Sequence, residues 1–296
     1  KDRQLAYWRG YLGDTHPILS LPADHPRKPI ASYQAARHAF DLPTDLVGAL
    51  RRTAQERDAT LFMALLAGFQ ALLYRHTSQG DIRVGVPIAN RNRVETAGLI
   101  GFFVNTQVLR GEIHGRMALT DVLGQVREGA IDGQTYQDLP FEQLVEALQP
   151  ERSLSHSPLF QVTINHLLRD ERAFQQLPGL AMTGYELGEQ AAQFELTLET
   201  VESPDGSVRA SLIHAAELFD ASTIERLARH TVHVLEMLAW HPERSIADID
   251  LLDESDREQL QAWGTGIPES GFAGMRPVHQ RIEQQAEKRP HAAAVI

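Results

Sequence analysis

The 296-residue sequence contains no cysteine. This absence excludes a disulfide framework, a zinc site built on thiolates and a cysteine nucleophile. Positive charge is also scarce, with 28 Lys and Arg against 39 Asp and Glu and a formal net charge of −11. Because neutralising phosphates requires clustered cations, we do not expect nucleic acid as a partner. The charge balance fits a soluble protein that handles neutral or cationic groups, and the lack of cysteine favours the cytoplasm.

Long apolar runs are absent as well. No stretch reaches the roughly 18 uninterrupted apolar residues of a membrane-spanning helix, so we expect no membrane partner. Hydrophobic residues nevertheless make up 43% of the chain, which is enough for a sizeable buried core. The first residue is Lys1 rather than Met, and the last residues, HAAAVI, read as part of an apolar strand. Both ends are therefore expected to continue in a longer polypeptide.

The pattern of apolar residues predicts an α/β layered sandwich between residues 38 and 240. The predicted strands are 38–43, 81–90, 100–111, 158–168, 194–202 and 207–215, with a hairpin turn at 203–206. The predicted helices are 5–12, 44–58, 60–79, 118–135, 141–148 and 221–240, with Thr44, Thr60 and Asp220 as N-caps.

A change of composition after Asp250 predicts the domain organisation. Residues 1–252 form the globular part, and residues 253–277 are polar with scattered Gly and Pro, as in a linker. Residues 278–296 then begin a new helix and strand. We find no internal repeat.

The stretch IGFFVNTQVLR places three adjacent polar residues, Asn105, Thr106 and Gln107, inside an apolar strand. Buried amides and hydroxyls cost roughly 1–3 kcal/mol each unless they are hydrogen-bonded. Two interpretations remain open. The side chains satisfy a bulge or a neighbouring loop, or they line a cavity that binds an amide-bearing substrate, since such cavities combine apolar walls with a few placed polar groups.

Two further stretches carry polar groups beside prolines. In TYQDLPFEQLVEAL, Gln137 and Asp138 precede Pro140, which opens a helix, so their simplest role is at the helix start. In RSLSHSPLF, Ser155 and His156 are neighbours. Neighbours in an extended segment point to opposite faces, which disfavours a Ser–His hydrolase.

Thirteen histidines raise the question of a metal site. His230 and His233 are three residues apart in a predicted helix, but that helix has no HExxH pattern and the chain has no cysteine. We therefore predict that both lie on the polar face of the helix and that the chain holds no metal.

Taken together, three stretches resemble the condensation domain of nonribosomal peptide synthetases, a family that joins two carrier-tethered thioesters through an amide bond. They are similar to the family motifs (I/V)GxFVNTxxxR, (H/Y)QDxPFE and R(D/S)xSxxPLFQ. Three motifs in the family's order make the resemblance specific, and it spans residues 1 to about 250. The matching residues are Ile100, Gly101, Phe103, Val104, Asn105, Thr106, Arg110, Tyr136, Gln137, Asp138, Pro140, Phe141, Glu142, Arg152, Ser153, Ser155, Pro158, Leu159, Phe160 and Gln161.

One family motif is missing from the chain. The family's active site centres on HHxxxDG, but no adjacent His pair occurs here, and neither Asp132-Gly133 nor Asp205-Gly206 has a His four residues before the Asp. The resemblance therefore implies the C-terminal subdomain of a condensation domain, expected to be inactive alone. VHQRIEQQAEKRPHAAAVI resembles the opening of an adenylation domain, which makes residues 253–277 the linker between the two.

The resemblance also implies a fold and a site. The fold is a chloramphenicol-acetyltransferase-like two-layer α/β sandwich, one of two subdomains that flank a tunnel. Segment 85–92 would form part of the tunnel floor, and a stretch within 163–200 would cross to the other subdomain. No catalytic residue is expected in this half. The implied substrate-tunnel residues are Asn105, Thr106, Gln107, Gln137, Asp138 and Ser157, and the implied structural residues are Gly101, Phe103, Arg110, Pro140, Phe141, Arg152 and Pro158.

The implied cofactor is phosphopantetheine, carried by partner proteins and not bound by the chain itself. The implied partners are donor and acceptor peptidyl carrier proteins, the upstream condensation subdomain and the downstream adenylation domain. The motifs are most similar to the subtype that joins an L-configured donor to an L-configured acceptor. An alternative is a non-catalytic, condensation-like platform that docks a carrier protein or a tailoring enzyme. A stand-alone acyltransferase using coenzyme A is disfavoured by the adenylation-like tail.

Overall fold

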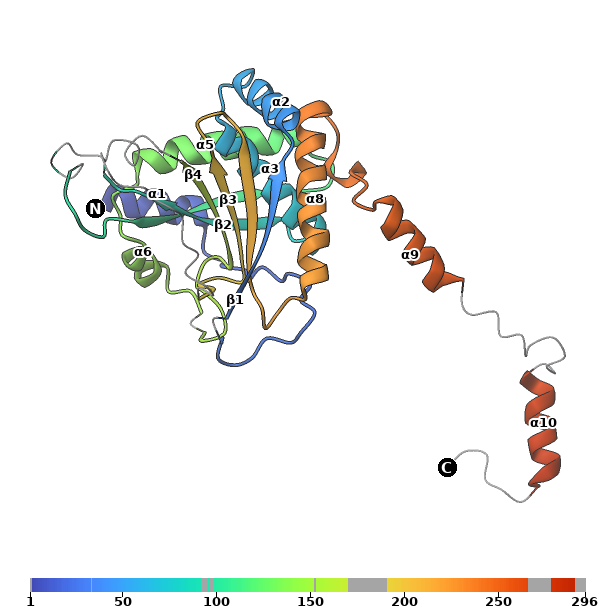
Figure 1. Ribbon diagram of the computed structural model, residues 1–296. Helices are drawn as coiled ribbons and strands as arrows, with labels where there is room; N and C mark the ends of the chain where they lie inside the picture. The colour runs from blue at the N-terminus through green and yellow to red at the C-terminus, as the bar shows by residue number, and fades with distance from the viewer. Residues whose placement is uncertain are drawn as a thin grey trace, which may run out of the picture. The chain divides into compact units, whose positions relative to one another are not determined.

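The computed structural model describes residues 2–32, 34–91, 95, 98–151, 153–169, 191–265 and 278–290 (Figure 1). The chain divides into two compact units, residues 1–251 and 252–296. Among the described residues, no helix combines the length and the apolar character needed to cross a membrane.

The first unit is built around a six-stranded sheet with the strand order β1-β6-β5-β4-β2-β3. β2, β4 and β5 run parallel to one another, and the other neighbouring pairs are antiparallel. The strands are β1 (Ala35–Leu42), β2 (Asp81–Ile88), β3 (Asn105–Glu112), β4 (Val162–Leu168), β5 (Leu196–Glu202) and β6 (Val208–Ala215). The helices are α1 (Asp2–Leu12), α2 (Thr44–Gln55), α3 (Leu61–Thr77), α5 (Leu119–Thr135), α6 (Phe141–Leu148), α8 (Ala221–Trp240) and the 3-10 helix η1 (Ile246–Asp248).

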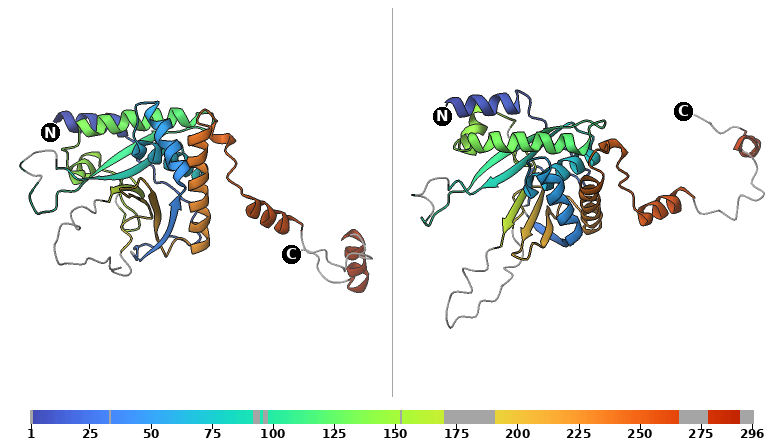
Figure 2. Two further views of the ribbon diagram at one scale, coloured as in Figure 1. Left: turned by 45° about the horizontal axis from the view of Figure 1, so that its top comes forward. Right: turned by 90° about the horizontal axis from the view of Figure 1, so that it is seen from above.

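Helices α2, α3, α5 and α8 form a layer on one face of the sheet (Figures 1 and 2). α3 contacts the other three and buries most of its surface, as expected for a helix that is apolar on almost every side. Alternate strand residues, among them Val84, Leu109, Val162 and Leu212, point into this layer and form the main core. The predicted two-layer α/β sandwich is confirmed.

A smaller hydrophobic cluster lies on the opposite face of the sheet, where α1 and α6 pack near β3. Val108 belongs to this cluster and its neighbour Leu109 to the main core, as the alternation of a strand requires. Phe160 joins the cluster by lying over Gly85 of β2, where a Cβ atom would stand 2.4 Å from the ring. Glycine at this position therefore lets the ring reach the sheet.

The buried side chain of Arg83 joins α1 to the sheet. It is 2% exposed, donates to the carbonyl oxygens of Leu12 (2.8 Å) and Thr15 (2.7 Å), and pairs with Asp81 at 2.9 Å. Arg110 reaches the same carboxylate at 3.1 Å. Burial pushes the pKa of Asp81 upward, but hydrogen bonds from both arginines outweigh it and hold that pKa below its ordinary value.

β3 is an edge strand, and two side chains satisfy its outward-facing backbone groups. The Tyr11 hydroxyl accepts from the N–H of Arg110 (2.9 Å) and donates to its carbonyl (3.0 Å). The Gln125 side chain satisfies the backbone of Glu112 in the same way: it accepts from the N–H (3.0 Å) and donates to the carbonyl (3.1 Å). The edge is thereby protected from pairing with another chain. Gly129 makes room for Tyr11, because a Cβ atom there would lie 2.5 Å from the hydroxyl.

Two strands begin later than their sequences predict. β3 begins at Asn105 instead of residue 100, because Asn105 pairs with Ile88, the last residue of β2, and no partner strand continues beyond it. β4 begins at Val162 instead of residue 158. Leu159 has a positive φ of 67°, unusual for a bulky residue, and this turns the chain before the strand can form.

The predicted helix caps have different outcomes. The Thr60 cap is confirmed, since its hydroxyl accepts from the N–H of Met63 at 3.2 Å. Thr44 is wrong as a cap, because α2 begins at Thr44 itself after Pro43. Asp220 occupies the N-cap position of α8 without a side-chain cap, and its carboxylate contacts His25 at 2.9 Å instead.

The placement of His230 on a polar helix face is wrong. α8 packs against α3 on this side, so His230 is buried and its Nδ1 lies 3.2 Å from Nε2 of His76. Burial, followed by the neighbouring His230 and Arg226, lowers the pKa of His76 to about 4. His76 is therefore neutral at pH 7, and the two rings belong to the packing of the two helices.

The second unit contains α9 (Glu254–Gly264) and α10 (Val278–Lys288). α9 lies inside the segment predicted as an irregular linker, and the Asp253 side chain starts it by accepting from the N–H of Asp256 at 2.8 Å. Its few apolar residues made the helix hard to recognise. The helix predicted after residue 277 is present as α10, and the strand predicted at the end of the chain lies outside the described residues.

The variant Tyr11→Phe tests whether the Tyr11 hydroxyl stabilises the edge strand β3. The substitution leaves the N–H and carbonyl of Arg110 without the Tyr11 hydroxyl, so we expect a loss of about 1–3 kcal/mol in the free energy of unfolding, measured with urea. Tyr7→Phe is the matched control, since the buried Tyr7 hydroxyl has no hydrogen-bond partner among the described residues and its loss should cost almost nothing. Equal effects of the two variants would contradict this account.

Candidate functional site

The Asn105 side chain connects two of the sequence motifs. Its Nδ2 donates to the carbonyl oxygens of Gln137 (3.1 Å) and Leu139 (2.9 Å), and its Oδ1 accepts from the N–H of Phe141 (3.0 Å). Phe141 is the first residue of α6, and the preceding Pro140 offers the helix no side-chain cap. Asn105 therefore satisfies a free N–H at the start of α6 and fixes the backbone of QDLPF.

A cavity of about 580 Å³ lies on the face of the sheet that the helical layer leaves uncovered. Its floor is made by residues of five neighbouring strands, and its walls come from the start of α6 and from segments 102–105 and 191–194. The floor residues are Pro87, Thr106, Thr163, Asn165, Thr197 and Ile213. The wall includes Phe102, Val104, Asn105, Pro140, Phe141 and Phe194, so its apolar character is typical of a substrate cavity.

The three adjacent polar residues of β3 divide between the two faces of the sheet. Asn105 and Thr106 line the cavity. Gln107 points the other way, is 7% exposed, and donates from Nε2 to the carbonyl of Gly133 in α5 at 2.7 Å. Its position follows from the two-residue period of a strand, which places Gln107 and Thr106 on opposite faces.

Gln137 and Asp138, the tunnel residues expected from the second motif, precede α6 and are not among the described residues that line the cavity. Gln137 donates to the carbonyl of Gln134 at 2.7 Å. Asp138 accepts from Gln4 at 3.1 Å and so ties the loop to α1. These two residues contribute through the backbone carbonyl of Gln137 and through the shape of the loop.

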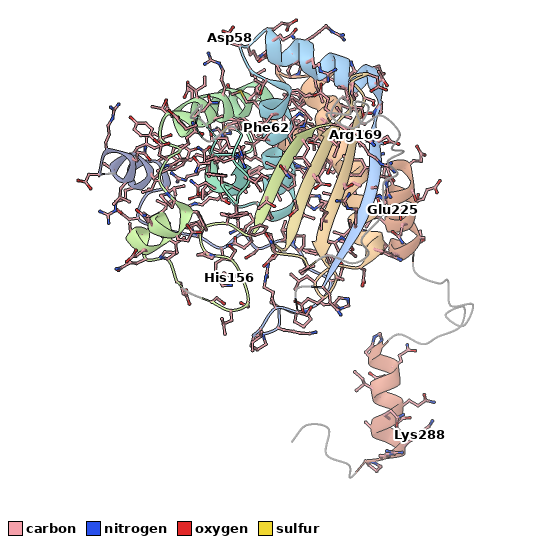
Figure 3. The ribbon with its side chains drawn as sticks, turned by 60° about the vertical axis from the view of Figure 1, so that its left-hand side comes forward. Asp58, Phe62, His156, Arg169, Glu225 and Lys288 are labelled. Atoms are coloured by element: carbon pink, nitrogen blue, oxygen red, sulfur yellow. The ribbon has the colours of Figure 1, made fainter. Side chains whose placement is uncertain are left out.

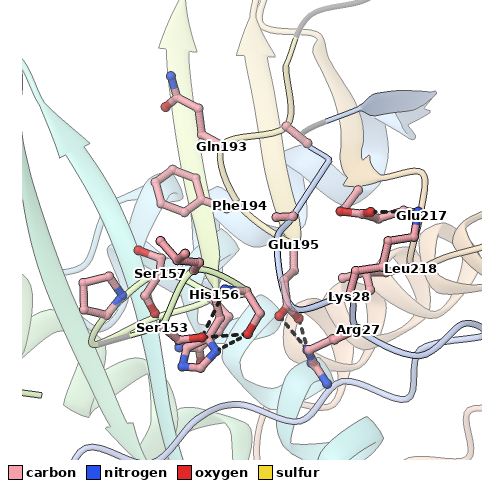
Figure 4. A pocket seen from close by; sticks show the side chains of 17 residues that line it. Arg27, Lys28, Ser153, His156, Ser157, Gln193, Phe194, Glu195, Glu217 and Leu218 are labelled. Atoms are coloured by element: carbon pink, nitrogen blue, oxygen red, sulfur yellow. Dashed lines mark hydrogen bonds and ion pairs between the residues drawn. The ribbon is translucent and has the colours of Figure 1, made fainter. Parts of the chain in front are cut away.

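A second cavity, of about 300 Å³, contains the predicted residues Ser157 and Pro158 (Figure 4). Arg27 and Glu195 form a two-point ion pair in its wall, with both N–O distances at 2.8 Å. Phe194 lines both cavities, as do the two residues before it, so segment 192–194 is their common wall. Ser157 therefore lies near the first cavity and not in it.

The prediction that Ser155 and His156 do not meet is wrong. Ser155 Oγ lies 3.1 Å from His156 Nδ1, because residues 154–156 form a bend and not an extended strand. Ser155 Oγ also lies 2.7 Å from Ser153 Oγ, which in turn accepts from the N–H of Ser155 at 3.0 Å. These contacts form a local side-chain-to-backbone turn of the kind common in loops.

Phe103 and Phe141, two of the residues expected to have structural roles, make ring contacts with neighbouring segments. The Arg91 guanidinium lies 4.4 Å from the centre of the Phe103 ring and donates to the carbonyl of Gly101 at 3.2 Å. Phe141 packs on Phe160 with ring centres 5.4 Å apart. Arg110 and Pro140 have the roles described above, and Arg152 lies outside the described residues.

Sequence reasoning missed three polar residues of the cavity floor: Thr163, Asn165 and Thr197. All three belong to predicted strands, and alternation alone places Thr163 and Asn165 on one face. Their meeting with Thr197 depends on the parallel register of β4 and β5, which pairs Thr163 with Thr197. That register is not readable from a single sequence.

The described residues contain no group of three or more His, Asp or Glu side chains placed to hold a metal ion. The cavity is also poor in charge. Glu142, an exposed residue at the start of α6, is the only acidic or basic side chain among the described residues that line it. The arrangement can position an uncharged group, but it offers no acid–base pair for proton transfer.

Fold and cavity together define a chloramphenicol-acetyltransferase-like sandwich that carries a cavity on the open face of its sheet. The chain belongs to the condensation domain family, since residues 1–261 match that family's sequence profile. The family is that of the nonribosomal peptide synthetases, as the curated relatives make plain.

The chain is 40% identical over 301 residues to one of the linear gramicidin synthase proteins of Brevibacillus parabrevis, covering 100% of this chain and 4% of that protein. It is 34% identical to a plipastatin synthase protein of Bacillus subtilis (strain 168), covering 99% of this chain and 8% of that protein. It therefore spans less than a tenth of the length of either relative.

Solved structures show the same fold. The X-domain from teicoplanin biosynthesis, in its complex with OxyB, aligns with a TM-score of 0.79 and 27% identity over 86% of this chain and 56% of that chain. A four-domain nonribosomal peptide synthetase bound to AMP and glycine aligns with a TM-score of 0.77 and 24% identity over 99% of this chain and 23% of that chain.

Asn105→Ala tests the connection between the motifs. The substitution removes three hydrogen bonds to backbone groups, so we expect the free energy of unfolding to fall by roughly 2–4 kcal/mol. Thr106→Val is the neighbouring control, because the Thr106 hydroxyl has no hydrogen-bond partner among the described residues, and its cost should stay within about 0.5 kcal/mol. Chemical denaturation of both variants measures the difference, and similar losses would refute the role of Asn105.

Proposed function

We propose that this chain is the C-terminal half of a condensation domain that forms an amide bond between a donor acyl or peptidyl thioester and an acceptor aminoacyl thioester. The observation that supports this most strongly is the Asn105 connection, which places FVNT and QDLPF at one cavity. Asn105 and Thr106 face the substrates, while Gln107, Gln137 and Asp138 hold the surrounding elements.

The proposed reaction requires this half of the domain to orient the two substrates and requires no nucleophile from it. The acceptor amine attacks the thioester carbonyl carbon, the C–N bond forms, the C–S bond breaks, and the thiolate leaves and takes up the proton that the amine loses. A thioester is already a reactive acyl donor, so orientation of the two groups supplies much of the acceleration. The imidazole of the family motif HHxxxDG, which this sequence lacks, is proposed to act from the other subdomain.

The proposal assigns residues 1–252 to the condensation subdomain, 253–277 to the linker and 278–296 to the start of an adenylation domain. The match to the gramicidin synthase relative supports continuation in a synthetase, because it covers the whole chain and so includes these last residues. The proposed partners are two peptidyl carrier proteins bearing phosphopantetheine, the upstream subdomain and the downstream adenylation domain. The cytoplasm is the proposed location.

A second candidate is a non-catalytic platform that docks a carrier protein or a tailoring enzyme. The similarity to an X-domain found in complex with OxyB favours it. The lining of the cavity favours the enzyme, since a docking platform has no use for polar groups inside a cavity. The two candidate functions differ in their use of the cavity: the enzyme binds its substrates there, whereas the docking platform does not use it.

The chain alone should form no peptide. We expect purified chain, mixed with donor and acceptor carrier proteins loaded with aminoacyl thioesters, to give product at the uncatalysed rate, because it lacks the histidine motif. The complete domain, with both subdomains, should be at least about 100-fold faster, in line with the usual contribution of one acid–base group. Mass spectrometry of the carrier proteins measures both, and a chain as active as the complete domain would contradict the proposal.

Filling the cavity distinguishes enzyme from platform. In the complete domain, Thr106→Phe should place a ring in the cavity and lower kcat/KM for peptide formation at least about 100-fold with little change in Tm. Glu225→Phe, on the exposed face of α8 (Figure 3), is the control and should leave the rate unchanged. A Thr106→Phe variant that keeps the wild-type rate would support the platform instead.

A further inference from the structure

Polar side chains line both the floor and the walls of the cavity, and those of the floor lie deepest in the sheet. Thr163 and Asn165 of β4 and Thr197 of β5 point into this cavity, whose walls carry the rings of Phe102 and Phe141 as well as polar side chains such as Asn90 and Gln193. Thr163 is only 4% exposed. A hydroxyl that sits this deep among apolar groups must be satisfied by the protein or by something in the cavity.

The two threonine hydroxyls satisfy each other only in part. Thr163 Oγ1 lies 2.7 Å from Thr197 Oγ1, so one hydroxyl donates its hydrogen to the other. The hydrogen of the accepting hydroxyl stays free to donate, and both oxygens keep a lone pair. The pair therefore presents one donor and at least one acceptor.

Asn165 adds a carboxamide beside the pair. It follows Thr163 by two residues and so shares its face of the strand. No described residue hydrogen-bonds to the Asn165 side chain, which leaves two N–H donors and one carbonyl acceptor free at the cavity. Since no Lys, Arg or His is among the described residues that line this cavity, an anionic group inside it would have no cation to pair with.

We propose that Thr163, Asn165 and Thr197 form a hydrogen-bonding subsite that selects an aminoacyl or peptidyl substrate with a neutral carboxamide side chain. A carboxamide both donates and accepts, and so matches the free groups of the floor. An apolar side chain of the same shape would leave those groups unpaired, and a carboxylate would be desolvated without a counter-charge. This inference rests on the proposed condensation reaction.

Three isosteric amino acids test the subsite: Asn, Leu and Asp, each attached through phosphopantetheine to the donor or the acceptor carrier protein. With the complete condensation domain, we expect kcat/KM for the asparaginyl substrate to exceed that for leucyl and aspartyl substrates by at least about tenfold in one of the two positions. In the variant Thr163→Val/Thr197→Val, and separately in Asn165→Leu, the ratio of asparaginyl to leucyl rates should fall below about threefold.

Ser211→Ala serves as the control, since Ser211 is a buried hydroxyl residue on the same face of the sheet that does not line the cavity, and its variant should keep the wild-type ratio. Thermal unfolding of each variant shows whether it is folded. A wild-type ratio near one in both positions, or a ratio that survives both cavity variants, overturns the subsite. If wild-type domain forms no peptide with any of the three substrates, the proposed function itself fails and the subsite with it.

Discussion

The geometry of the cavity depends on the carboxamide of Asn105. It uses both amide hydrogens on the carbonyls of the QDLPF segment and its oxygen on the first N–H of α6. The position of α6 in turn sets Phe141 against Phe160, and Phe160 lies on Gly85 of the sheet. The Asn105 side chain is thus connected, through α6 and Phe141, to the packing of the cavity wall. This connection explains why two motifs some 30 residues apart in the sequence lie side by side in the fold.

The two faces of the sheet have separate physical roles. One face and the helical layer bury the main apolar core, which contains most of the buried apolar residues of the fold. The other face is covered only in part, by a small cluster that Arg83 and Tyr11 attach to β2 and β3. Because core stability comes from the helical side, threonines and an asparagine can occupy the open face at little cost to folding.

Periodicity and turn chemistry predicted the strands, most helices and a layered α/β architecture, since these depend on local sequence. Features that depend on distant partners were not predictable. β3 starts at Asn105 because its partner strand ends there, and His230 is buried because α3 lies beside it. For the site, the assignment of Asn105 and Thr106 to the cavity could be inferred from the motif. The contribution of Thr197 could not, because a parallel register places it beside Thr163.

Among the described residues that line the cavity, Glu142 is the only charged one. This fits the proposed reaction, in which this half positions the two substrates and the other half handles the proton. A carboxylate beside the amine would hold it protonated, and any fixed charge would retain water; either effect would slow the attack. Neutral hydroxyls and amides orient the two reactants and need no counter-ions, so one flank can specialise in positioning. In the proposed reaction, the group that handles the proton belongs to the opposite flank. In such an arrangement, specificity for the substrate and acceleration of the chemical step can change independently of each other.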